Sequence, residues 1–138
     1  MIACDRLLVH RPTATRALHR LLLPPGTIKD TPLPAGTPPE QAYALLAAAG
    51  HHLDWHETVR TRLPQPDERT DLHLPEATLI LIAYRATCDA SNHQRALLLE
   101  ETRIGGHRGE LTYTLHTQET PTSPRPAPSP GEPADRQA

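Results

Sequence analysis

Hydrophobic and polar residues alternate from His52 to Leu63, a pattern typical of a β-strand whose two faces meet different surroundings. One face carries Leu53, Trp55, Glu57, Val59 and Thr61, and the other carries Asp54, His56, Thr58, Arg60 and Arg62. Pro64 and Pro66 end the strand, because a proline has no backbone N–H to donate to a ladder. The alternation therefore predicts one strand at 52–63.

The next residues predict a short helix and a buried strand. Pro66-Asp67-Glu68 is typical of a helix start, because its acidic side chains lie near the positive end of the helix dipole. We predict this helix at 66–73. The long apolar run that follows predicts a strand at 77–88.

Turn residues divide the rest of this half. Residues 89–93 are polar and typical of a turn, so 94–103 is expected to return as a second strand. Gly105-Gly106 forms a bend. The alternation at 110–116 predicts a last strand.

The front of the chain contains a second set of short segments. Residues 2–10 are β-like, and Arg11-Pro12-Thr13 breaks them. By pattern alone, 15–23 is either a strand or a helix, and Pro24-Pro25-Gly26 ends it. A Pro-rich loop at 27–36 follows.

A helix at 38–49 has the clearest local signals in the chain. Thr37, with Glu40 three residues later, predicts a capping box, and Pro38 is expected at the first helical position. Gly50 is expected to end the helix in the left-handed conformation. The apolar face of this helix comprises Ala42, Leu45, Leu46 and Ala49.

A weak internal repeat relates the two halves. Positions 6 and 85, 16 and 95, and 26 and 105 are each 79 residues apart, and the matching residues are Arg6 with Arg85, Arg16-Ala17-Leu18 with Arg95-Ala96-Leu97, and Gly26 with Gly105. A true duplication makes 15–23 a strand; a chance match leaves it open. The duplication predicts an α+β fold, in which two similar hairpins form an antiparallel sheet with short helices and a cleft between the halves.

Composition excludes several classes of protein. A chain of 138 residues accommodates one domain, and its net charge of −2 gives no general attraction to nucleic acid or anionic membranes. No apolar run reaches the roughly 20 residues that span a bilayer. The N-terminus does not resemble a signal peptide, so we expect a cytoplasmic protein without a membrane partner. Residues 118–138 are rich in proline and are expected to form a disordered tail after a folded part at 1–117.

The sequence offers little for metal or catalytic chemistry. His51, His52 and His56 are close together, but no Cys or carboxylate completes a ligand set. Gly105-Gly106 lacks the Lys-Ser/Thr sequence of a phosphate loop, and no serine stands in a Gly-x-Ser-x-Gly setting. We therefore expect no metal, no cofactor and no enzymatic activity.

Several segments agree in order and spacing with one known family. They are E-T-V-R-T-R-L-P-Q-P-D-E (57–68), L-P-E-A-T-L-I (74–80), Y-R-A-T-C-D-A (84–90) and R-I-G-G-H-R-G-E-L-T-Y (103–113). The chain resembles the effector-binding (UTRA) domain of GntR-type, HutC-like bacterial transcription regulators, which has a chorismate lyase-like fold. The resemblance covers residues 1–116. It implies a domain that senses a small anionic or polar metabolite and acts as a homodimer.

The resemblance also implies a ligand pocket. Gln41 stands where the family has a serine that meets the anion of the ligand at a helix N-terminus. Leu98 replaces a glutamate of sugar-phosphate binders, and His19 occupies the related place in the first hairpin. The candidate ligand-binding residues are Arg6, His19, Gln41, Tyr43, Tyr84, Arg85, Leu98, Glu100 and Thr102.

Other interpretations stay open. Arg6 and Arg85 could be rim arginines that pair with Asp5, Asp89 or the backbone, and Tyr43 could belong to the core. These regulators contact DNA through a winged helix-turn-helix domain, which we expect to be absent from this chain together with the first strand-rich part of the effector domain. A ligand-free dimerisation or interaction fragment is therefore the alternative function. A lyase is the least favoured, since the pocket walls needed for chorismate would be incomplete.

Overall fold

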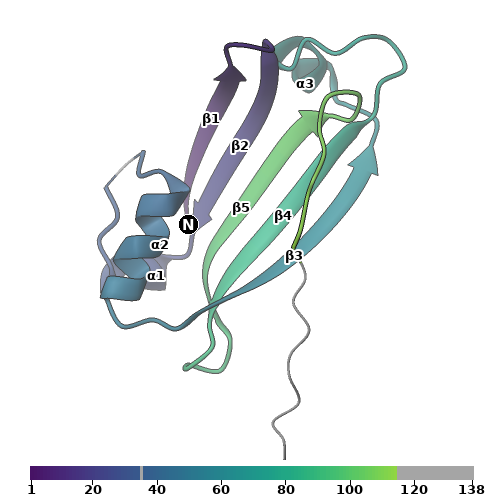
Figure 1. Cartoon of the computed structure of the whole chain (residues 1–138). Helices are drawn as coiled ribbons and strands as arrows, with labels where there is room; N and C mark the ends of the chain where they lie inside the picture. The colour runs from purple at the N-terminus through teal and green to yellow at the C-terminus, as the bar shows by residue number, and fades with distance from the viewer. Residues whose placement is uncertain (35, 115–138) are drawn as a thin grey trace, which may run out of the picture.

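The described part of the chain forms a five-stranded antiparallel sheet with three short helices (Figure 1). The computed structural model describes residues 1–34 and 36–114. The elements follow in the order β1 (Ile2–His10), β2 (Thr15–Leu23), α1 (Pro25–Asp30), α2 (Pro39–Ala48), β3 (Leu53–Arg62), α3 (Pro66–Asp71), β4 (Ile80–Asp89) and β5 (Arg95–Gly105). The strand order is β1-β2-β5-β4-β3. The predicted tail at 118–138 and its boundary at 117 lie outside the described residues.

Two hairpins, β1–β2 and β4–β5, form most of the sheet, and β2 pairs with β5 at its centre. The segment at 15–23 is therefore a strand, as the repeat predicted. The turns are also alike, because Ala14 and His93, which are 79 positions apart, both have positive φ angles, of 54° and 50°. The glycines of the repeat are not equivalent: Gly26 lies in α1, whereas Gly105 ends β5.

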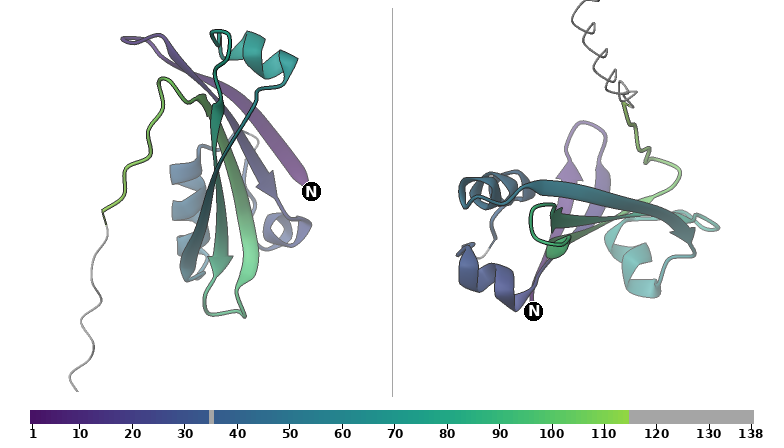
Figure 2. Two further views of the ribbon diagram at one scale, coloured as in Figure 1. Left: turned by 90° about the vertical axis from the view of Figure 1, so that its right-hand side faces the viewer. Right: turned by 90° about the horizontal axis from the view of Figure 1, so that it is seen from below.

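The helices cover both faces of the sheet. Helix α2 lies on one face, and α1 and α3 lie on the other (Figure 2). A first apolar cluster joins α2 to the sheet; it consists of Leu21, Leu23, Ala42, Leu46, Leu97 and Leu98. A second cluster fills the space beneath the end of α3; it consists of Leu72, Leu74, Ile80 and Ile82. The residues between Asp71 and Ile80 are thus tied to the sheet at the end opposite α2.

The sequence predicted the C-terminal end of α2 correctly but not its N-terminal cap. The Thr37 capping box is wrong: Pro38 is the N-cap, and the Thr37 hydroxyl donates to the carbonyl of Pro34 at 2.6 Å instead. Gly50 has a φ of +92°, and the N–H groups of Gly50 and His51 bond back to Ala47 and Leu46. This pair of bonds is a Schellman motif, so the predicted left-handed glycine cap is confirmed.

Apart from small shifts at the ends of other elements, three segments depart from the predictions. Residues 25–30 form α1 where a loop was expected, because a Pro at the first helical position is compatible with a helix start. Strand β4 begins at Ile80 rather than at 77, after Ala77 adopts a positive φ of 57°. The strand predicted at 110–116 is wrong for 110–114. Strand β5 is already paired on both sides, so it leaves no edge for a following hairpin strand.

A buried carboxylate joins α3 to two strands. Glu68 is 1% exposed; its two oxygens each accept from Arg62 at 2.7 Å, one also accepts from Arg103 at 2.7 Å, and the other accepts the N–H of Gln65 at 2.8 Å. The Arg62 hydrogen bonds, with help from the Gln65 N–H and Arg103, lower the pKa of Glu68 to about 2 against the opposing effect of burial. This Arg62–Glu68–Arg103 cluster fixes α3 against β3 and β5.

Replacing Glu68 with Gln should destabilise the fold by about 3 kcal/mol at pH 7, because two guanidinium groups lose their shared counter-charge. The pKa of this carboxyl is lower in the folded protein than its ordinary value of 4.5. Its contribution to stability is therefore complete above pH 5 and is lost as the pH falls from about 4.5 towards 2. Urea unfolding followed between pH 7 and pH 2 measures both effects.

Asp67→Asn is the matched control, because Asp67 is exposed in the same helical turn. We expect this variant to lose no more than about 0.5 kcal/mol and to keep the acid-dependent loss of the wild type. Equal losses for the two variants would show that the helix dipole, not the arginine cluster, carries the effect of Glu68.

Candidate ligand-binding cleft

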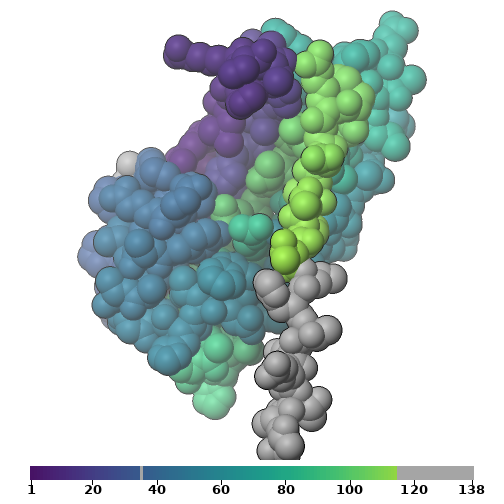
Figure 3. Space-filling model, in the orientation of Figure 1, coloured from purple at the N-terminus to yellow at the C-terminus, as the bar shows by residue number. Residues whose placement is uncertain are grey.

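A cleft of about 470 Å³ lies on the α2 side of the sheet. In Figure 3 this surface is hollowed between α2 and residues 109–114. The cleft is lined by Arg6, Leu8, His19, Pro38, Pro39, Glu40, Tyr43, Arg85 and Glu100. These residues come from four strands and from the N-terminus of one helix, so the assembled sheet is needed to form the cleft.

Strand register places the charged side chains in one row. Arg6 pairs with His19 across β1 and β2, and Arg85 lies between Glu100 on β5 and Glu57 on β3. Between the paired strands β2 and β5, Glu100 stands opposite Leu21, which is two residues along β2 from His19. Because alternate residues of a strand share a face, all five polar side chains lie on the α2 side.

Two buried polar side chains meet at the centre of this row. His19 is 6% exposed and Glu100 is 8% exposed, and the distance from His19 Nε2 to Glu100 Oε1 is 3.3 Å. His19 Nδ1, Glu100 Oε2 and the Tyr43 hydroxyl are buried and have no hydrogen-bond partner among the described residues. Leaving a buried polar group unpaired costs about 1–3 kcal/mol, so three such atoms in one cleft indicate a place for a polar ligand or water.

The two arginines of the cleft are held by different partners. Arg6 Nη2 donates to the carbonyls of Gly36, at 3.2 Å, and Thr37. Arg85 Nε donates to Glu57 Oε2 at 2.7 Å. Each guanidinium keeps further N–H groups that these bonds do not use.

Of the predicted rim partners, the backbone binds Arg6, whereas neither arginine pairs with Asp5 or Asp89. Asp5 instead accepts two bonds from Arg20, at 2.6 and 3.1 Å. Asp89 accepts from the Ser91 hydroxyl at 2.6 Å and from His51 Nδ1 at 2.7 Å. Hydrogen bonds from Ser91 and His51 hold the pKa of Asp89 well below its ordinary range. Both aspartates are therefore occupied away from the cleft.

The N-terminus of α2 faces the cleft through Pro38, Pro39 and Glu40. The first backbone bond of the helix runs from the Ala42 N–H to the Pro38 carbonyl at 2.9 Å. The N–H groups at the two positions before Ala42 have no acceptor within the helix. They form a partial positive charge at the cleft, beside the negatively charged side chain of Glu40.

Tyr43 belongs partly to the cleft and partly to the packing of α2. Its ring meets Trp55 edge to face, with 5.9 Å between centroids and 85° between planes. A second hollow of about 430 Å³ lies beside this pair and is lined by Tyr43, Trp55, Glu57, Arg85 and Tyr113. The Tyr113 hydroxyl donates to Glu57 Oε1, so the segment of residues 109–114 forms one wall of the polar region.

The structure brings together five of the nine predicted ligand-binding residues, namely Arg6, His19, Tyr43, Arg85 and Glu100. Thr102 lies next to them in a small hollow with Glu57 and Leu111. The side chain of Gln41 is exposed outside the cleft.

Two predicted site residues belong to the core. Tyr84 is adjacent to Arg85 on β4, so its side chain points to the opposite face of the sheet, where it packs against the apolar cluster beneath α3. Leu98 is 1% exposed and is packed beneath α2, so the carboxylate that reaches the cleft is that of Glu100, two residues further along β5. Position 98 was chosen from the family resemblance. The register of the β4–β5 hairpin shifts between Thr87, which pairs with Leu98, and Cys88, which pairs with Ala96.

Sequence reasoning missed several wall residues. Leu8, which lines the cleft, shares a face of β1 with Arg6, and Glu57, which lines the adjoining hollows, pairs with Arg85, so the alternation along each strand could have indicated both. Pro38, Pro39 and Glu40 follow from the helix N-terminus once α2 is placed beside the sheet. Tyr113 was missed because the alternation placed it in a strand predicted at 110–116.

Comparison with solved structures identifies the fold. PhnF from Mycobacterium smegmatis has a TM-score of 0.61 and 20% identity over 83% of this chain and 49% of that chain. The separate effector domain of PhnF gives 0.61 and 21% identity, over 83% of this chain and 69% of that one. This chain has the fold of a GntR-type effector domain. The predicted α+β, chorismate lyase-like architecture is therefore confirmed.

A GntR-family transcriptional regulator from Enterococcus faecalis V583 has the same fold, with a TM-score of 0.61, 12% identity, and coverage of 80% of this chain and 78% of that chain. This chain spans about half of the length of PhnF, at 49%. No protein-family model matches the sequence, and no curated protein matches it. At identities of 12–21%, the likeness establishes the fold alone.

The described residues contain neither a metal-ligand cluster nor a membrane-spanning helix. Within residues 1–34 and 36–114, no group of three or more His, Cys, Asp or Glu side chains could hold a metal ion. The helices of this same part are all too short or too polar to cross a membrane.

Replacing both His19 and Glu100 tests whether the central pair serves stability. The double variant His19→Leu/Glu100→Leu should be within about 1 kcal/mol of the wild type or more stable, because apolar residues remove a buried pair with unpaired atoms. His19→Leu alone should cost about 2–3 kcal/mol, since the Glu100 carboxylate then stays buried without its partner. Chemical denaturation of the three proteins measures the difference. A double variant as unstable as the single one would show that the pair supports the fold itself.

Proposed function

We propose that this chain is the small-molecule sensing domain of a GntR/HutC-type transcription regulator. The three unpartnered buried polar atoms in the α2-side cleft carry this proposal, because they supply one acceptor, one hydroxyl and one ring nitrogen for a ligand. The likeness of fold to GntR-family regulators supports the same conclusion.

The charges of the cleft restrict the ligand. Arg6, Arg85 and the helix N-terminus favour an anionic group. Glu40 and Glu100 disfavour a second one and favour hydroxyl or ammonium groups. The best match is a small metabolite with one anionic group and several hydrogen-bond donors, such as a sugar phosphate, an amino acid or a hydroxy acid. A compact polyanion is disfavoured.

Binding can be coupled to a change of conformation through Arg85. An anionic group that attracts Arg85 competes with Glu57, and Glu57 also accepts the bond from Tyr113. If Glu57 moves when Arg85 leaves it, the bond from Tyr113 to Glu57 is lost, and the wall formed by residues 109–114 is released. A ligand shifts the equilibrium only by its difference in affinity for the two arrangements. DNA recognition depends on a winged helix-turn-helix, which the described residues do not form.

A thermal-shift screen with sugar phosphates, amino acids and organic acids tests the sensing function. A true ligand at 100 times its Kd should stabilise the protein by about 2.7 kcal/mol. Arg85→Gln should weaken that ligand at least tenfold, because the variant removes the charge that faces the anion. Arg60→Gln removes the same charge from the other face of the neighbouring strand β3 and should leave affinity unchanged.

The second candidate function is a homodimerisation module without a ligand. The edge strand β1 favours it, since its outer backbone edge is unpaired in the described sheet and it exposes Ile2, Leu7, Leu8 and Val9. Light scattering measures the oligomeric state of the same samples. A dimer that no class of metabolite stabilises would contradict the sensing function and favour this alternative.

A further inference from the structure

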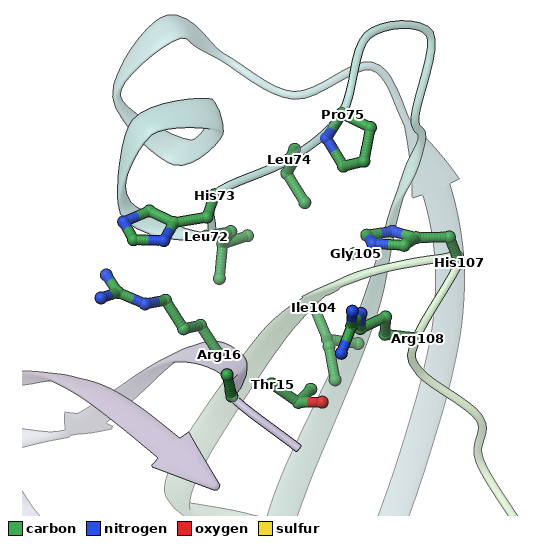
Figure 4. A pocket seen from close by; sticks show the side chains of 11 residues that line it. Thr15, Arg16, Leu72, His73, Leu74, Pro75, Ile104, Gly105, His107 and Arg108 are labelled. Atoms are coloured by element: carbon green, nitrogen blue, oxygen red, sulfur yellow. The ribbon is translucent and has the colours of Figure 1, made fainter. Parts of the chain in front are cut away.

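A separate hollow of about 260 Å³ lies at the end of the sheet where the β1–β2 turn, the end of α3 and the turn after β5 meet (Figure 4). Its walls carry Arg16, His73, His107 and Arg108, and its lining contains no Asp or Glu. None of these residues lines the α2-side cleft. The hollow is therefore a second place with its own chemistry.

The four basic side chains surround the hollow from opposite sides. Figure 4 shows His73 and Arg16 on one side, and His107 and Arg108 on the other. Leu72, Leu74 and Ile104 lie between the two pairs and give the hollow an apolar floor. The arrangement suits a ligand with an anionic group and a small apolar part.

Backbone contacts hold both arginines in place. Arg16 Nη1 donates to the carbonyl of Asp71 at 3.1 Å, and Arg108 Nη1 donates to the carbonyl of Thr13 at 2.8 Å. These bonds use one N–H group of each guanidinium, and the other groups stay available. The bond from Arg16 also occupies a carbonyl at the end of α3, which would otherwise repel an anion.

Within residues 1–34 and 36–114, neither Arg16 nor Arg108 makes an ion pair with a carboxylate. Five arginines of this part do pair with Asp or Glu, and the six that do not are Arg6, Arg11, Arg16, Arg60, Arg69 and Arg108. Two like charges that face one hollow raise the local positive potential. An anion that binds between them relieves this repulsion and can accept several charge-assisted hydrogen bonds.

We propose that this hollow binds a tetrahedral oxyanion, either free inorganic phosphate or the phosphate of a small phosphomonoester. Arg16 and Arg108 supply the charge, and His73 and His107 supply further hydrogen bonds from the two sides. The proposal is independent of the sensing function of the cleft, because the two sites share no residue.

Titration with inorganic phosphate at constant ionic strength tests the proposal, with calorimetry for affinity and amide NMR for location. We expect saturable binding, with the largest shifts at residues 14–16, 73 and 105–108. Arg16→Gln/Arg108→Gln should weaken binding at least tenfold. The matched control Arg11→Gln/Arg60→Gln removes the same charge at exposed positions outside the hollow and should change affinity less than twofold.

A second arm separates the two sources of the oxyanion. It compares inorganic phosphate with glycerol 3-phosphate in the Arg85→Gln background, which removes a cleft arginine without touching the hollow. Tighter binding of glycerol 3-phosphate identifies a phosphomonoester site, and equal or weaker binding identifies a phosphate site. Shifts spread over all exposed arginines, equal losses in the test and control variants, or no saturation would each overturn the proposal.

Discussion

The backbone ladder between β2 and β5 is the constraint on which the rest of the molecule depends. It joins two hairpins that are distant in sequence. It also places Glu100 opposite Leu21, two residues along β2 from His19, so that the side chains of His19 and Glu100 share a face. A shift of one residue would turn one whole strand over. His19 and Glu100 would then lie on opposite faces, and the core beneath α2 would lose the leucines of one strand. The cleft and the apolar packing thus depend on one register.

The regions with strong local signals were predictable from the sequence. Period-two alternation located β3, and the turn residues and the repeat located the two hairpins. The glycine after α2 was predictable because a helix end needs the left-handed conformation there. Arg6, His19, Tyr43, Arg85 and Glu100 were expected near one another through the family resemblance, and the structure brings them to one cleft.

The features that depend on distant pairing could not be predicted in this way. The resemblance placed both Leu98 and Glu100 at the site, but only Glu100 faces the cleft, in a hairpin whose register is shifted by the extra residue Leu97 on β5. Glu68 was read as an acidic residue near a helix dipole, because its partner Arg103 comes from a strand 35 positions away. Residues 110–114 alternate like a strand, but pairing requires a free edge, and local sequence does not reveal which strands have one.

The segment that borders the two hollows beside the cleft has a different relation to the fold from the cleft walls. Arg6, His19, Arg85 and Glu100 stand on paired strands, so their backbone positions are set by the sheet. The segment of residues 109–114, with Leu111 and Tyr113, lies over the sheet without joining it. We expect substitutions and length changes in this segment to leave the ladder intact, because no ladder pair includes it. The shape of the polar region therefore changes with this one segment, while the sheet that carries its charges stays the same.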